Sequence, residues 1–139
     1  MIAEDLRYWV GFNKVQGIAA ARLRALLDYF GDLNTAWNAP VHDLQQAGLD
    51  KRSLNNLVRA RKAFDLDAEL ERLAKANVQV LTWDDASYPP HLREIYNAPP
   101  VLYVRGQIEK QDEWAVAVVG TRRASAYGKE AARMAGTGL

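Results

Sequence analysis

The most informative stretch of the sequence is AVAVVGTRRASAYGKEAARMA, residues 115–135. The sequence is almost continuously apolar from Trp114 to Val119, which predicts a strand buried on both faces of a parallel sheet. Gly120 then predicts a tight turn, and a helix is expected to begin near Ala126. This order is typical of an α/β domain, in which ligands bind at the carboxyl ends of the strands.

The turn carries groups that can bind an anion. A helix N-terminus offers unpaired N–H groups and the positive end of a dipole to a phosphate. Gly120 allows the backbone to approach a ligand closely, and the hydroxyls of Thr121 and Ser125 can donate hydrogen bonds. Arg122 and Arg123 add charge, and the planar guanidinium of Arg122 suits a phosphodiester. The plainer alternative is an ordinary turn with a solvated arginine pair.

Several other kinds of site are disfavoured. The turn has neither the G-x-G-x-x-G spacing of a dinucleotide site nor the G-K-[ST] of a P-loop, so we expect no NAD, no ATP and no other cofactor. We expect no metal either, since the chain has no cysteine and neither His42 nor His91 has a second ligand at helical spacing. No catalytic constellation is visible, so the sequence favours a protein that is not an enzyme.

Residues 3 to 75 are predicted to be helices with short breaks, and four or more of them are expected to share one core. Gly31 follows one apolar stripe at the place of a C-terminal cap. The stripes comprise Ile2, Leu6, Trp9 and Val10; Leu23, Leu26, Leu27 and Phe30; Leu54, Leu57 and Val58; and Leu66, Leu70 and Leu73. The last helix is expected to end near Asn77. We place a domain boundary near Ala76.

After that boundary the sequence pattern changes from helical to strand-like. VQVLTW at 78–83 and VLYVRG at 101–106 predict strands, because they are short and rich in β-branched and aromatic residues. Pro89 and Pro90 predict the opening of a short helix that runs through Ile95. The fold class is therefore α+β, with an all-α domain at 1–76 and the start of an α/β domain at 77–139. AGTGL at the end suggests an interrupted helix, so we expect that α/β domain to be truncated.

Composition sets wider bounds. Hydrophobic residues make up 49% and charged residues 25% of the 139 residues, which is typical of a folded globular protein. The net charge of +1 gives no general attraction to nucleic acid, so any such binding must come from local basic groups. The absence of cysteine, of a signal peptide and of a long apolar run favours a cytoplasmic protein that does not enter a membrane.

VQGIAAARLRALL, residues 15–27, resembles a helix-hairpin-helix, a motif that binds phosphates through the amides of its turn. Gly17 and Arg22 are its possible DNA contacts, but Ala19 stands where a second glycine is usual. A purely structural hairpin is the alternative.

The four tryptophans are placed on predicted helices or strands, which favours core packing over base stacking. Tyr127, beside the turn, is the better stacking candidate.

Two longer runs together resemble one family. WDDASYPPHLREIYNAPPVLYVRG at 83–106 and VAVVGTRRASAYG at 116–128 are similar to the start of the Rossmann-like domain of the DNA-processing protein A family, also called DprA or Smf. The matching positions are Asp85, Tyr88, Pro89, Leu92, Ile95, Pro99, Pro100, Leu102, Tyr103, Gly106, Val119, Gly120, Thr121, Arg122, Ser125, Tyr127 and Gly128. The helical region resembles the family's sterile-alpha-motif-like (SAM-like) or helix-hairpin-helix domain.

The resemblance implies a function. It implies a mediator that binds and protects single-stranded DNA, helps to load a RecA-type recombinase in natural transformation (competence), and forms a dimer with itself. Gly120, Thr121 and Arg122 match one part of the family's basic DNA pocket, and Arg123 lies where the family is less strict. The family's second glycine-rich motif has no match, so weak binding is expected. Two alternatives remain: a nucleotide-hydrolysing enzyme of the phosphoribohydrolase type, and a helical protein-interaction module.

Overall fold

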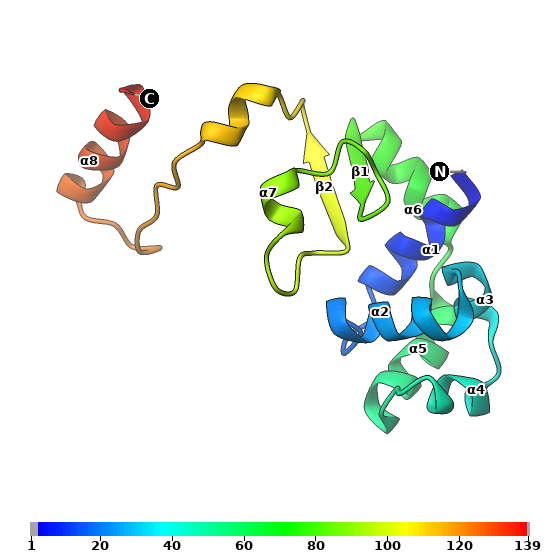
Figure 1. The fold of residues 1–139 in the computed structure, drawn as a ribbon. Helices are drawn as coiled ribbons and strands as arrows, with labels where there is room; N and C mark the ends of the chain where they lie inside the picture. The colour runs from blue at the N-terminus through cyan, green and yellow to red at the C-terminus, as the bar shows by residue number, and fades with distance from the viewer. Residues whose placement is uncertain (1–2, 139) are drawn as a thin grey trace. The chain divides into compact units, whose positions relative to one another are not determined.

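A computed structural model describes residues 3–138, so the predicted helix residue Ile2 lies outside the described residues. Helices predominate, as Figure 1 shows. The elements are α1 (Ala3–Asn13), α2 (Ala20–Phe30), α3 (Leu33–Asn38), α4 (Val41–Gln46), α5 (Lys51–Ala63), α6 (Leu66–Lys75), β1 (Val78–Thr82), α7 (Pro90–Arg93), β2 (Val101–Arg105), the 3₁₀ helix η1 (Lys110–Trp114) and α8 (Ala126–Thr137). The predicted α+β class is therefore confirmed. Among residues 3–138, no helix is both long enough and apolar enough to cross a bilayer.

The chain divides into two compact units, of which the first ends at Ile108 and the second begins at Glu109. The first unit contains α1 to α6 and also the strand pair, which packs beside α1 and α6 (Figure 1). The compact unit thus continues past Ala76, and the domain division into 1–76 and 77–139 stays a prediction.

One hydrophobic core joins helices α1 to α5. Phe12 of α1 is fully buried and meets the ring of Trp37 edge-on, with 5.1 Å between the ring centroids. Leu26, Leu44 and Leu57 bring α2, α4 and α5 into the same core, and each is fully buried. The apolar stripes predicted for α1, α2 and α5 therefore contribute buried residues to this core, whereas α6 has none that is buried. Apolar burial of this kind drives the folding of the unit.

Capping residues define where the helices begin and end. The carboxylates of Asp32, Asp50 and Asp65 each accept a hydrogen bond from the backbone N–H three residues on, at 2.7, 3.0 and 3.1 Å. At the end of α2, Gly31 has a φ of +87°, as its predicted role as a cap requires. Asn77, after α6, also has a positive φ, of +56°.

Among residues 3–138 the sheet has two strands, and they do not form the parallel sheet expected of an α/β domain. β1 and β2 pair antiparallel, with Val78 opposite Arg105 and Thr82 opposite Val101. Both strands lie where the sequence predicts them. The relative direction of two strands depends on the path of the segment that connects them, and here residues 83–100 return the chain so that β2 runs antiparallel to β1. The composition of the strands gives no information about that path.

The strand predicted at 114–119 is also wrong. Trp114 ends η1, and the residues from Ala115 to Thr121 form neither helix nor strand. Trp114 is 88% exposed and Val119 is 90% exposed, so the predicted core packing of Trp114 fails as well. A strand needs a neighbour that pairs with its backbone N–H and C=O groups. In the described part of the chain, β1 and β2 pair only with each other.

A polar cluster ties the α1–α2 turn to α5. The guanidinium of Arg22 donates hydrogen bonds to the carbonyl oxygen of Gly17 at 2.7 Å and to Oγ of Ser53 at 2.9 Å. The Ser53 hydroxyl donates to the same carbonyl at 3.1 Å, and Arg22 lies 3.4 Å from the carboxylate of Asp50. Because Ser53 is almost fully buried, its hydroxyl needs these partners. We call these four residues the hairpin clamp.

We expect Gly17→Ala to lower the free energy of unfolding by about 2 kcal/mol or more, through backbone strain and overpacking. Gly17 has a φ of +96°, and a Cβ there would lie 2.6 Å from Oγ of Ser53. Gly48→Ala is the matched control, since its φ is +104° and a Cβ at that position would meet no atom within 4 Å. Urea denaturation of both variants measures the difference.

A double-mutant cycle separates the two causes. Ser53→Ala removes the clashing oxygen, so Gly17→Ala should cost less in that background than in the wild type. Equal costs in the two backgrounds, or equal losses for Gly17→Ala and Gly48→Ala, would contradict the clamp.

We expect the stability that Glu69 contributes to depend on pH. Arg72 donates two hydrogen bonds to its carboxylate and Lys14 lies 2.8 Å away, and these contacts lower the pKa of Glu69 from 4.5 to about 2. A depressed carboxyl pKa stabilises the fold above pH 4.5, and this stabilisation is lost as the pH falls toward 2. The loss in unfolding free energy caused by Glu69→Gln should therefore shrink between pH 7 and pH 3. The same loss at both pH values would refute this, and exposed Glu71→Gln serves as the control.

Candidate nucleic-acid interface

The turn from Gly120 to Gly128 lies in the second unit and leads into α8. Ser125 is the N-cap of this helix, and its hydroxyl accepts a hydrogen bond from the N–H of Gly128 at 3.1 Å. The helix start predicted near Ala126 is therefore confirmed. Ser125 uses one lone pair on this cap, and its hydroxyl hydrogen remains able to donate to a ligand.

A cavity of about 360 Å³ opens at the turn. It brings together three predicted site residues, Gly120, Thr121 and Ser125. A Cβ built on Gly120 would meet no atom within 4 Å, so the space beside this glycine is open to a ligand. The remaining lining residues are Val118, Val119, Ala124, Gly128, Lys129 and Ala132.

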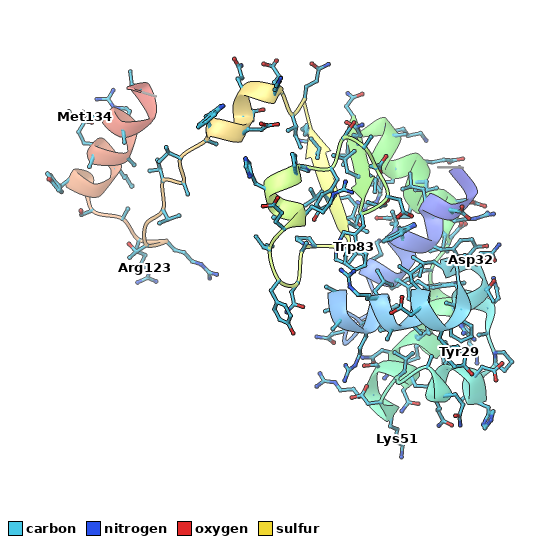
Figure 2. The ribbon with its side chains drawn as sticks, in the orientation of Figure 1. Tyr29, Asp32, Lys51, Trp83, Arg123 and Met134 are labelled. Carbon is cyan, nitrogen blue, oxygen red and sulfur yellow. The ribbon has the colours of Figure 1, made fainter. Side chains whose placement is uncertain are left out.

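Arg122 and Arg123 do not line this cavity. Both are exposed, and no ion pair or hydrogen bond engages either of them in the part of the chain that the structure describes. Figure 2 shows Arg123 at the turn between η1 and α8. The structure therefore places two unengaged positive charges beside the cavity, and their role as phosphate ligands stays a prediction.

Sequence reasoning missed Lys129. It lies one helical turn after Ser125 and lines the same cavity, to which it adds a third cation beside the two arginines. The i, i+4 spacing from the cap was the signal that could have found it.

The possible hairpin contacts, Gly17 and Arg22, belong to the hairpin clamp. Three of the bonds that Arg22 makes, to Gly17, Ser53 and Asp50, are internal. The carbonyl of Gly17 accepts two of the clamp's hydrogen bonds. The structure gives both residues a structural role, and their contact with DNA stays a prediction.

The residues matched in the first run build the fold around the strand pair. The phenol of Tyr88 is buried and donates to the carbonyl oxygen of Pro99 at 2.7 Å, and burial raises its pKa. The carboxylate of Asp85 accepts from the N–H of Thr82 at 2.8 Å, and Arg93 donates to the carbonyl oxygen of Asp85 at 2.7 Å. The side chains of Tyr88, Asp85 and Arg93 therefore make hydrogen bonds within the protein.

The aromatic side chains divide between core and surface. Trp9 and Trp37 are buried, as predicted, and Trp83 is half-buried. Tyr127 is 84% exposed beside the turn, so its ring is accessible, and base stacking on it stays a prediction. Among the described residues, no three His, Cys, Asp or Glu side chains come together in a group that could hold a metal ion.

Comparison with known proteins gives the family. The family model described as DNA recombination-mediator protein A matches residues 79–139. Protein Smf of Synechocystis sp. is 30% identical over 133 residues, which cover 92% of this chain and 33% of that protein. Protein Smf of Escherichia coli is 32% identical over 92 residues, which cover 66% of this chain and 24% of that protein.

A third relative is the putative DNA processing protein DprA of Mycobacterium tuberculosis. It is 29% identical over 153 aligned residues, which cover 100% of this chain and 38% of that protein. No solved structure matches the chain at a significant level. The chain spans between about a quarter and two fifths of the length of these relatives. The family model and these relatives agree with the resemblance in the sequence: the chain belongs to the DNA recombination-mediator protein A family, the DprA and Smf proteins.

Proposed function

We propose that this chain supplies part of a single-stranded DNA-binding surface in a recombination mediator. The observation that carries the proposal is the turn at 120–125, where Arg122 and Arg123 are exposed and unengaged among the described residues. They stand beside a cavity lined by the cap of α8 and by Lys129. Three cations and a helix N-terminus form a strongly anion-attracting combination.

The mechanism is capture of the phosphate backbone. The guanidinium of Arg122 can donate two parallel hydrogen bonds to a phosphodiester, while the hydroxyl of Thr121 and the first amides of α8 can donate to its other oxygens. None of these groups reads the edge of a base, so binding should depend little on sequence. The exposed ring of Tyr127 offers one stacking surface for an unpaired base.

Family membership supports the wider role. We propose that the protein acts in the cytoplasm, protects incoming single-stranded DNA, assists a RecA-type recombinase in natural transformation and forms a dimer, without catalysing a reaction. We propose further that 1–76 is a SAM-like or helix-hairpin-helix domain and that 77–139 belongs to a Rossmann-like domain.

The nucleotide-hydrolysing alternative is less well supported. Hydrolysis of a nucleoside monophosphate would need a carboxylate close to the sugar, and the residues that line the cavity at the turn include none.

We expect Arg122→Ala to weaken binding to a thymidine 25-mer and to lower the salt slope by about 0.7, because one fewer phosphate is neutralised. Fluorescence anisotropy of a labelled oligonucleotide between 20 and 200 mM NaCl measures both quantities. Arg105→Ala, which removes an exposed arginine of β2, is the charge-matched control and should change neither.

Two outcomes would count against the proposal. Unchanged affinity and salt slope in Arg122→Ala would remove the turn from the binding site. Turnover of nucleoside monophosphates by the wild-type chain would favour the hydrolase.

A further inference from the structure

Helix α5 has an unusual charge. Its sequence, KRSLNNLVRARKA, contains five basic residues and no acidic one. Arg61 is directed toward the interior, where it donates hydrogen bonds to the carbonyl oxygens of Ala36 and Ala39 at 3.4 and 2.8 Å. The other four basic side chains, those of Lys51, Arg52, Arg59 and Lys62, are exposed.

These four residues share one side of the helix. At about 100° per residue, α5 places them together with Asn55 and Asn56 within roughly 140° of arc. The opposite side is buried and comprises Ser53, Leu54, Leu57 and Ala60. We call the side formed by Lys51, Arg52, Asn55, Asn56, Arg59 and Lys62, all exposed except the half-buried Asn56, the basic face.

Nearby acidic groups do little to neutralise this face. Asp50 is held by Arg22 at 3.4 Å, and hydrogen bonds from Ser53 lower its pKa. Glu69 is held by Lys14 and Arg72, at 2.8 and 2.6 Å.

Two further acids lie on neighbouring elements. The carboxylate of Asp65 accepts from Ala68 as the cap of α6. Asp43 lies on α4, which packs against α5. In the described part of the chain, no ion pair joins any of these acids to the basic face.

A cavity of about 210 Å³ adjoins the basic face. Lys14 and Arg59 line it together with Phe64, and no acidic side chain does. The amide of Asn56 donates to the carbonyl oxygen of Gln16 at 2.7 Å, which fixes the α1–α2 turn against α5. The cations of the basic face thus lie on a helix whose other side is buried in the core.

We infer that the basic face binds the phosphodiester backbone of DNA as a contact separate from the turn at 120–125. Exposed arginines, lysines and asparagines are the side chains that donate to phosphate oxygens. A membrane surface is a poorer partner, because the apolar side of α5 lies in the core and cannot insert into lipid. The inference rests on the proposed function only for the choice of DNA as the partner.

The test is a triple variant of the whole 139-residue chain, Arg52→Gln, Arg59→Gln and Lys62→Gln. It should lower the salt slope for a thymidine 25-mer by about 2, and the affinity at 50 mM NaCl by about tenfold or more. The matched control, Lys75→Gln, Arg105→Gln and Lys110→Gln, removes the same charge from exposed positions outside α5 and should change neither. A 25-base-pair duplex in parallel shows which form of DNA the face prefers.

A second triple variant guards against misfolding. Arg52→Lys, Arg59→Lys and Lys62→Arg keep the charge and should bind like the wild type. The inference is overturned if this variant binds as poorly as the glutamine variant, or if the control triple weakens binding as much. It also fails if the glutamine variant binds both DNA forms normally.

The proposed function has a separate readout. In an Arg122→Ala background the glutamine variant should still lower the salt slope. If Arg122→Ala binds DNA like the wild type while the glutamine variant binds weakly, the turn is rejected as a DNA contact and the basic face is retained. If Arg122→Ala binds weakly while the glutamine variant binds like the wild type, only the basic face is rejected.

Discussion

The junction between the helices and the strand pair of the first unit is built around Trp83, the residue that follows β1. Its ring meets the ring of Trp9 edge-on at 5.9 Å, and the guanidinium of Arg24 lies 4.5 Å from its centre. Its indole N–H donates to the carbonyl oxygen of Ala98 at 3.1 Å. This side chain, labelled in Figure 2, therefore links α1, α2, the strand pair and the loop before β2. These contacts add to the packing of β1 beside α6 and of Val101 in the core, and a two-stranded sheet without such packing is only marginally stable in water.

Local patterns predicted local structure well. The stripe of Leu23, Leu26 and Leu27, the glycine cap of α2 and the start of α8 near Ala126 were all predicted, because each depends on residues within a turn or two. The segment 115–119 shows the limit. Its apolar residues report that it suits burial, but its strand state depends on pairing partners that composition does not name. The antiparallel pairing of β1 with β2 was unpredictable for a similar reason.

The candidate site was predicted in part. Gly120, Thr121 and Ser125 share a cavity because they are close in sequence, whereas Lys129 was missed. Arg22 was singled out for its place in a motif, yet its bonds to Gly17 and Ser53 are internal. Gly17 lies only five residues from Arg22, but Ser53 lies 31 residues away, and no local pattern shows that partner. The same bonds help to fix α5, whose charged side is left facing solvent. A net charge of +1 thus conceals two local concentrations of positive charge.

Hydrogen–deuterium exchange of the whole chain, with and without a thymidine 25-mer, tests the central claim that these two basic regions contact DNA. DNA bound at both regions should slow exchange at the start of α8 and along α5, with β1 and β2 unchanged. Protection confined to the strand pair or to the α2–α3 connection, with α5 and the first turn of α8 unaffected, would contradict it.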